Sequence, residues 1–204
     1  MPIAMREDDP RRAKLDRMLA EELVADSFTV TGPEDVGRML DALRKEGGDS
    51  WEIYDPLTGW LDERRAGALR ARLGSAFRDA YGCDAWVVPS VVVVSALFKD
   101  LMATWDAAGE QVITADRAQL NDANGIVVAG WVPATSLWIT VYGVDGEAIA
   151  FRSGGIETLV RWGVEKTQDM LPEDAWLTTD RRIARAIQAA LGLGGAALVH
   201  YATP

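Results

Sequence analysis

The chain has 204 residues, of which 49% are hydrophobic, so a sizeable core is expected and a disordered chain is not. Its 21 basic and 31 acidic residues give a formal net charge of −10, which argues against general binding to nucleic acid or to anionic membranes. Because Cys83 is the one cysteine, an internal disulfide and a cysteine metal cluster are both excluded.

Two sequence features bear on the cellular compartment. The N-terminal segment MPIAMREDDPRR lacks the apolar core of a signal peptide, and no apolar run reaches the roughly 18 residues of a membrane span. The single cysteine fits a reducing environment. We therefore expect a cytoplasmic protein that does not enter a membrane.

Two helices are predicted within the first 47 residues. Asp9-Pro10 places a capping carboxylate before a proline in the first turn, and an apolar stripe follows it up to Leu23. Residues 27–31 alternate and predict a short strand. The segment from Thr31 to Glu34 has capping-box spacing and predicts a second helix that ends at Gly47.

The most regular amphipathic pattern begins at Asp62, after a predicted strand at 51–55 and a turn at 56–59. Gly82 marks its end. We expect Leu69, Leu73 and Phe77 to be buried. They belong to an apolar arc that contains Ala66, Leu69, Leu73, Ala76, Phe77 and Ala80.

Part of the next segment, 85–108, can be interpreted in two ways. Residues 85–94 predict a strand interrupted by Pro89, and Ser95 could cap a helix that runs to Ala108. Residues 91–94 fit either the strand or the first turn of that helix, and periodicity does not decide between them. Residues 111–114 predict a weak strand.

The clearest β pattern lies between Gly125 and Gly155 and predicts a central meander over 126–152. Its strands are 126–132, 137–144 and 147–152. The first two are joined by 133–136, and the last two by a two-residue turn at Asp145-Gly146. In that register Tyr142 faces Ile149. Both faces of the pair are largely apolar, so we expect helices to cover the sheet on both sides.

The C-terminal part predicts a helix after Gly155, a break at 171–174 and a final helix capped by Thr179 or Asp180 that stops at Gly192. A last short strand is predicted at 196–201. Together the elements predict a single α+β domain. Its sheet is mixed or mainly antiparallel, and about five amphipathic helices cover it. A weak alternative boundary lies near Gly109.

The sequence contains no recognisable catalytic, metal-binding or cofactor-binding motif. His200 is the only histidine and has no Gly-x-Ser-x-Gly sequence to accompany it, and with Cys83 it cannot form a zinc site. Residues 192–197 match Gly-x-Gly-x-x-Ala, but they follow a helix and precede a strand, the reverse of the dinucleotide-binding order. A calcium-like stretch at 122–125 lacks the ligands of a calcium loop.

Two alternatives remain open. The first is an enzyme that uses a carboxylate-bound metal ion, such as a nuclease, if several carboxylates meet in space. The second is a small-ligand binding domain that uses an aromatic sheet face carrying Trp138 and Tyr142. The carboxylates in question are Asp116, Asp122, Asp145, Glu157 and Asp180.

The helix predicted from Asp62 to Tyr81 carries five arginines against three acidic residues, a charge of +2 on a chain whose remainder carries −12. It could dock an acidic partner or a phosphate-bearing ligand, because arginine pairs in a bidentate manner with both. The alternative is that its arginines pair with the protein's own acids. The candidate binding arginines are Arg64, Arg65, Arg72 and Arg78.

These observations favour a non-catalytic, acidic protein-interaction or assembly protein. Bacterial or phage factors of the immunity, antitoxin, inhibitor or virion-component type have this character. Eight tryptophans spread along the chain suit core and interface positions. The expected partner is another protein, with self-association as an alternative.

Overall fold

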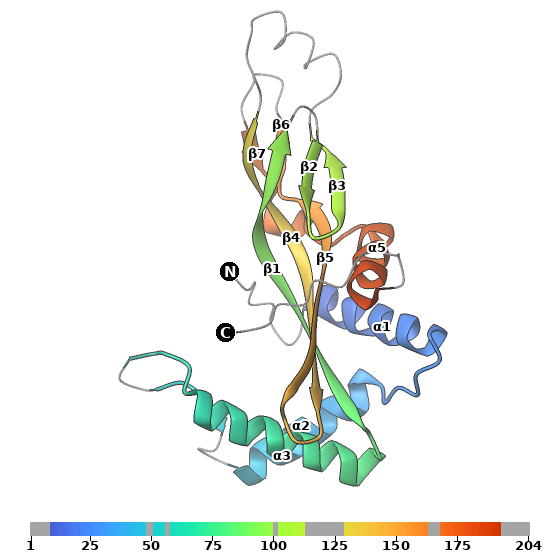
Figure 1. Cartoon of the computed structure of the whole chain (residues 1–204), viewed down its shortest axis with the longest axis vertical. Coiled ribbons are helices and arrows are strands. Elements are labelled where there is room, and N and C mark those ends of the chain that lie inside the picture. The colour runs from blue at the N-terminus through green and yellow to red at the C-terminus, as the bar shows by residue number, and fades with distance from the viewer. Residues whose placement is uncertain are drawn as a thin grey trace, which may run out of the picture. The chain divides into compact units, whose positions relative to one another are not determined.

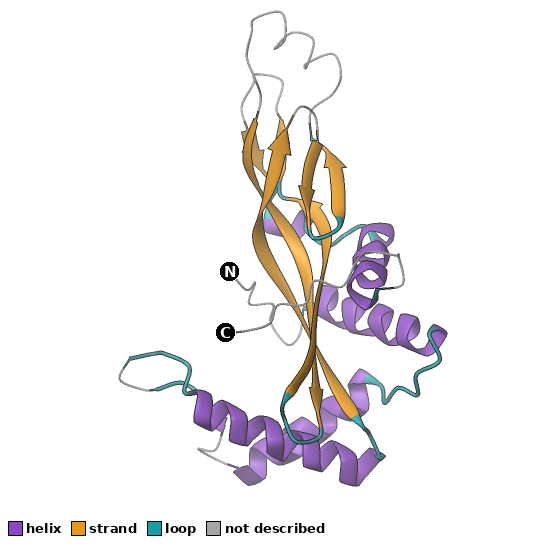
Figure 2. Ribbon diagram, viewed as in Figure 1, coloured by secondary structure: helices purple, strands orange, loops and turns teal. Residues whose placement is uncertain are grey.

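The computed structural model describes residues 9–47, 51–55, 58–99, 102–112, 129–162 and 168–192. These residues form four α-helices, a short 3₁₀-helix and seven strands, so the fold class is α+β (Figures 1 and 2). No helix in these ranges is long and apolar enough to cross a membrane. The elements are α1 (Pro10–Ala25), α2 (Pro33–Gly47), α3 (Glu63–Tyr81), β1 (Ala85–Lys99), β2 (Met102–Trp105), β3 (Ala108–Gln111), β4 (Ala129–Gly143), β5 (Ala148–Thr158), β6 (Val160–Trp162), β7 (Gln168–Met170), η2 (Glu173–Ala175) and α5 (Asp180–Leu191).

Strands β1 to β5 form one antiparallel sheet with the order β3-β2-β1-β4-β5, and β6 pairs with β7 in a second sheet. The chain divides into two compact units. The sheet unit comprises Met1–Leu15, Ser90–Trp138 and Arg152–Pro204, and the hairpin unit comprises Asp16–Pro89 and Ile139–Phe151. Gly109, near the predicted alternative boundary, lies inside β3 in the sheet unit. The single domain therefore stays a prediction.

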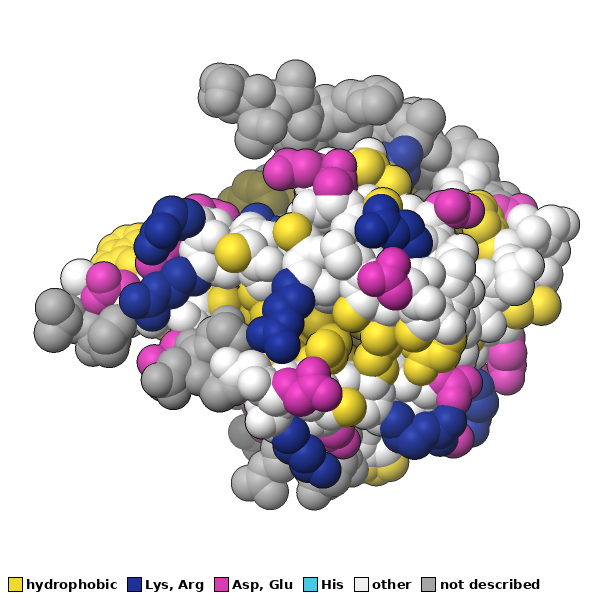
Figure 3. All heavy atoms as spheres, turned by 90° about the horizontal axis from the view of Figure 1, so that it is seen from below, with side chains coloured by type: hydrophobic (Ala, Val, Ile, Leu, Met, Phe, Trp, Pro, Cys, Tyr) yellow, Lys and Arg dark blue, Asp and Glu magenta, His cyan; other side chains and the backbone are white. Residues whose placement is uncertain are grey.

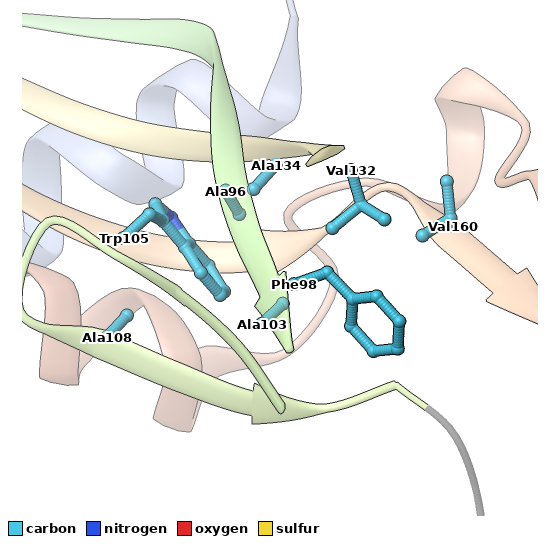
Figure 4. Close-up of a cluster of buried hydrophobic side chains, with 8 residues drawn as sticks. All are labelled: Ala96, Phe98, Ala103, Trp105, Ala108, Val132, Ala134 and Val160. Atoms are coloured by element: carbon cyan, nitrogen blue, oxygen red, sulfur yellow. The ribbon is translucent and has the colours of Figure 1, made fainter. Parts of the chain in front are cut away.

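The core of the sheet unit is built from one face of its strands, because side chains alternate along each strand. Small side chains next to Trp105 and Phe98 let the strands and β6 pack closely (Figure 4). The Trp105 indole Nε1 donates a hydrogen bond of 3.0 Å to the Thr135 carbonyl, which satisfies its buried polar atom. The cluster consists of Ala96, Phe98, Ala103, Trp105, Ala108, Val132, Ala134 and Val160.

The hairpin unit packs α3 against the turn that joins β4 to β5. Gly74 of α3 lies under the Val144 backbone, and Gly146 of the turn lies against the backbone of Ala71. A side chain at either glycine would occupy space that the other backbone already fills. Beside this contact, the rings of Phe77, Trp86 and Tyr142 pack in a row.

The four helices agree with the predicted ones. The Asp62 side chain accepts a hydrogen bond from the Arg65 N–H, and Gly82 ends α3 with a left-handed φ of 66°. Leu73 and Phe77 are buried as predicted, whereas Leu69 is half-buried. Gly192 ends α5 with a φ of 80°. Glycine takes these positions because it has no Cβ to clash in the left-handed conformation.

The helix predicted at 95–108 is wrong. β1 continues without interruption to Lys99, so residues 91–94 are strand, and β2 and β3 follow as a hairpin. The burial of Ala96 and Phe98, with Leu97 exposed between them, has the period of a strand. Pro89 lies inside β1 but outside the stretch Leu97–Lys99 that pairs with β2. Its missing N–H therefore removes no hydrogen bond to β2.

The three-stranded meander is also wrong. The predicted connection at 133–136 lies inside β4, where Ala134, Thr135 and Ser136 are fully buried. The Pro133 carbonyl accepts a hydrogen bond of 2.8 Å from the Leu159 N–H. Turn-forming residue types therefore stay extended here because buried neighbours and backbone pairing stabilise the strand. β4 pairs with β1 on one side and β5 on the other.

The hairpin exists, but its predicted register is wrong by one residue. The Gly143 N–H donates to the Glu147 carbonyl at 2.9 Å, and the Gly146 N–H donates to the Gly143 carbonyl at 3.0 Å. Three residues therefore form the loop, with Gly146 at a φ of 82°. This is the three-residue turn with a left-handed glycine, rather than the two-residue type I′ turn. Gly143, not Val144, pairs with Glu147, so Tyr142 does not face Ile149.

Three further predictions differ from the structure. Residues 27–31 are irregular, 51–55 contribute one isolated bridge, and the helix predicted after Gly155 is replaced by the end of β5 and by β6. The described helices do not cover the sheet on both sides along its whole length, since Ile149 and Phe151 are 62% and 41% exposed. The predicted strand at 196–201, His200 and the calcium-like stretch at 122–125 lie outside the described residues.

Candidate functional site

A short loop immediately before α3 presents the most exposed tryptophan of the described residues. Residues 51–55 and 58–62 run antiparallel with Tyr54 bridged to Leu61. The Asp55 N–H donates to the Trp60 carbonyl, and the Asp62 N–H donates to the Ile53 carbonyl, each at 2.8 Å. We call these residues the Trp60 loop. Their backbone hydrogen bonds tie the two described sides of the loop together and so restrict its conformations.

The side chains of the Trp60 loop face solvent although they are large and apolar. Trp60 is 77% exposed, Tyr54 59% and Leu61 42%. The Asp55 carboxylate accepts a hydrogen bond of 3.0 Å from the Thr58 N–H. Polar groups of the loop therefore stabilise the turn. Exposed Trp and Tyr on an ordered backbone are typical of protein-binding surfaces.

The helix that follows places Arg64 and Arg65 close to this loop in the chain. Arg65 forms an ion pair of 3.3 Å with Asp62 and donates a hydrogen bond of 3.4 Å to the Glu52 carbonyl. Arg64 is exposed, and within the described part of the chain no ion pair or hydrogen bond engages its guanidinium. Arg64 is therefore available to a partner, whereas Arg65 ties the helix to the loop.

The other predicted binding arginines have neighbours of their own. Arg78 lies 3.6 Å from the Asp79 carboxylate, and Arg72 is half-buried and already engaged. On the side of the molecule that Figure 3 shows, basic and acidic side chains are interspersed. The alternative of arginines paired with the protein's own acids therefore describes Arg65 and Arg78, and Arg64 departs from it.

The two aromatic residues of the predicted sheet face belong to different units. Tyr142 is stacked on Trp86 with ring centroids 4.7 Å apart, and the Arg70 guanidinium lies 5.6 Å from the centre of its ring. The Trp86 Nε1 donates to the Gly143 carbonyl at 3.3 Å. Tyr142 thus packs within the hairpin unit. Trp138, in the sheet unit, is 37% exposed.

The sheet unit contains a polar cluster that the sequence did not indicate. The Arg182 guanidinium bridges two carboxylates: Nη1 lies 3.2 Å from Glu157 Oε2, and Nη2 contacts Glu110 Oε1. Glu157 is 3% exposed, and its Oε1 accepts a hydrogen bond of 2.5 Å from the Leu177 N–H. Glu110 Oε2 accepts from the N–H and the hydroxyl of Thr158 at 2.8 and 3.1 Å.

The cluster lines a small cavity of about 150 Å³ and brings α5, β3, β5 and the residues before α5 together. Leu177 adopts a left-handed φ of 58°, which is unusual for leucine, and this conformation aims its N–H at Glu157. Because the three charged residues are 25 and 72 positions apart in the sequence, no local pattern could have predicted their meeting. A bridging guanidinium and complete hydrogen bonding are typical of a structural ion cluster.

The carboxylates considered for a metal site have other partners where the structure describes them. Asp145 caps the hairpin turn by accepting from the Glu147 N–H at 3.0 Å, and Asp180 pairs with Lys14. Asp116 and Asp122 lie outside the described residues. Within the described ranges, no three His, Cys, Asp or Glu side chains are grouped so that they could hold a metal ion.

A second charged cluster lies at the start of α1. Asp9 accepts hydrogen bonds from the backbone N–H of Arg11 at 2.9 Å and from its guanidinium at 2.6 Å. The side-chain hydrogen bond from Arg11 is the main reason that the pKa of Asp9 falls from 3.8 to about 2. Arg11 also donates to the Glu173 carbonyl at 2.6 Å, which links α1 to η2 beside an open hollow of about 670 Å³.

Comparison with known proteins gave no match: no family model, no curated protein and no solved structure is significantly similar to this chain.

Proposed function

We propose that this chain is a non-catalytic protein-interaction protein whose partner binds the Trp60 loop and Arg64. The observation that carries the proposal is the 77% exposure of Trp60 on a loop closed by backbone hydrogen bonds. Trp, Tyr and Arg are the residue types most enriched among those that dominate binding energy at protein interfaces. Here one of each lies within a span of eleven residues, at Trp60, Tyr54 and Arg64.

The ordered backbone of the loop supports this proposal energetically. Binding to a flexible loop costs free energy because the loop must be ordered, and a loop already closed avoids much of that cost. Burial of a tryptophan removes a large apolar area from water, and each Å² contributes about 25 cal/mol. An exposed, unpaired arginine adds a hydrogen-bonding group that can pair with a partner carboxylate without first breaking an internal ion pair.

The test compares capture of partner proteins from cells that express the chain naturally, with wild type and variants immobilised at equal density. Trp60→Ala should weaken binding of the captured partner by about 30-fold, which corresponds to a hot-spot loss of about 2 kcal/mol. The hydrogen bonds at Trp60 use its backbone carbonyl and N–H, so the loop should remain folded. Arg64→Glu should also weaken binding, and the loss should diminish at high salt.

Phe28→Ala is the matched control, because Phe28 is 58% exposed in the same unit and lies outside the loop. Its capture should equal that of wild type. Equal capture by Trp60→Ala, Arg64→Glu and wild type would refute the proposal. A rise of several degrees in Tm on addition of magnesium or manganese would instead support the carboxylate-metal enzyme.

A further inference from the structure

The sheet unit has a second face, opposite the cluster around Trp105, which the described residues leave open. Strand pairing places Leu97 opposite Thr104 and Thr104 opposite Gly109, so these residues share one face. The alternation along β4 places Trp131 on that side too, since Val132 and Ala134 belong to the core. We call it the outer face. Its exposed residues are Ser95, Leu97, Lys99, Met102, Thr104, Gly109, Gln111, Ala129 and Trp131.

The outer face exposes three large apolar side chains. Trp131 is 68% exposed, Leu97 46% and Met102 42%. A Cβ added at Gly109 would lie 3.5 Å from the Met102 methyl group, so the surface is continuous across neighbouring strands. Neighbouring strands are separated by about 4.8 Å, which makes the four strands together about 19 Å wide.

The charge of the outer face indicates what could cover it. The whole chain contains 31 acidic residues, yet the outer face carries none, and its one charged residue is Lys99 at the end of β1. Two chains of charge −10 repel each other, and a contact that contains no carboxylates adds least to that repulsion. Trp and Met are enriched, and acidic residues depleted, at the centres of protein interfaces.

We propose that two copies of this chain pair through their outer faces. A twofold axis brings the same patch of each copy together, so a patch with exposed apolar side chains and no carboxylates can pair with itself. The narrow sheet makes this interface small, and we therefore expect dissociation in the micromolar range or weaker. The outer face belongs to the sheet unit and the Trp60 loop to the hairpin unit, so different substitutions test the two proposals.

Sedimentation equilibrium between about 1 and 500 µM tests the proposal, since this range brackets the expected dissociation constant. Wild type should change from monomer to dimer across the range, and added salt should favour the dimer because it screens the repulsion between the two chains. Leu97→Glu and Trp131→Glu should each remain monomeric throughout, because each places two carboxylates in the interface. Both side chains are exposed, so both variants should keep the wild-type Tm.

Trp60→Ala serves as the control, because it removes an exposed tryptophan of the hairpin unit and should dimerise like wild type. A wild type that is monomeric at every concentration overturns the proposal, and so does a dimer that persists in both glutamate variants. A monomeric wild type whose glutamate variants lose several degrees of Tm would show that another segment of the same chain covers the face. None of these results affects the partner test, which depends on Trp60 and Arg64.

Discussion

Replacement of Gly74 by alanine measures how closely α3 packs against the hairpin turn. A Cβ at this position would lie 2.4 Å from the Val144 carbonyl oxygen and 2.7 Å from the carbon of the same group. Real Cβ atoms keep more than 3.0 Å from such neighbours, and backbone atoms cannot rotate away as a flexible side chain can. The helix and the turn would therefore have to separate.

Two opposing effects set the size of the change. Alanine favours the helix interior over glycine by about 1 kcal/mol. Overpacking of a tight contact costs about 1–3 kcal/mol, and separation would also loosen the stack of Trp86 on Tyr142. We expect Gly74→Ala to lower the free energy of unfolding by about 1–2 kcal/mol, despite the gain in helix propensity.

Gly67 provides a matched control on the same helix. A Cβ there would meet only the end of the Arg70 side chain, at 3.8 Å, so Gly67→Ala should gain the propensity and should not lose packing. Urea denaturation of both variants, followed by tryptophan fluorescence and circular dichroism, gives the two free energies. The difference between them isolates the contact with Val144. A Gly74→Ala protein as stable as Gly67→Ala would refute this account of the packing.

Two other predictions concern the charged clusters. Arg182→Met should lower the free energy of unfolding by about 3 kcal/mol, because it leaves the buried carboxylate of Glu157 without its cation, whereas Arg181→Met on the exposed side of α5 should change it by less than about 0.5 kcal/mol. Equal losses of unfolding free energy in the two variants, measured by urea denaturation, would show that the ion pair with Glu157 is not the cause. The folded-state pKa of Asp9 lies below its usual 3.8, so its contribution to stability should be complete above about pH 4 and should fall as the pH approaches 2. Titration by NMR should show this pKa near 2 in wild type and closer to 3.8 in Arg11→Ala, and a value that does not respond to that substitution would exclude Arg11 as its cause.

The sequence by itself determined the α+β class and predicted the four helices that the structure contains, because their start and stop signals are local, although it also predicted helices at 95–108 and after Gly155 that are strands. The carboxylate of Asp62 and the glycine at position 82 are a start and a stop that need no distant partner, and the arc that contains Leu73 and Phe77 defines the buried side of α3. The existence of a hairpin near Asp145-Gly146 was also predictable from local turn chemistry. Its register was not, since a two-residue and a three-residue loop suit the same residues, and the close approach of Gly146 to Ala71 accompanies the observed turn.

Only the tertiary structure decided the strands of residues 95–108 and 133–136. An apolar run such as that around Ala96 and Phe98 suits a helix or a strand equally, and the choice depends on neighbours that lie elsewhere in the chain. The same holds for the candidate sites. Whether Trp60 and Trp131 are exposed or buried depends on what packs over them. The meeting of Arg182 with Glu110 and Glu157 joins positions far apart in sequence, and side-chain identity carries no information about such distances until the chain has folded.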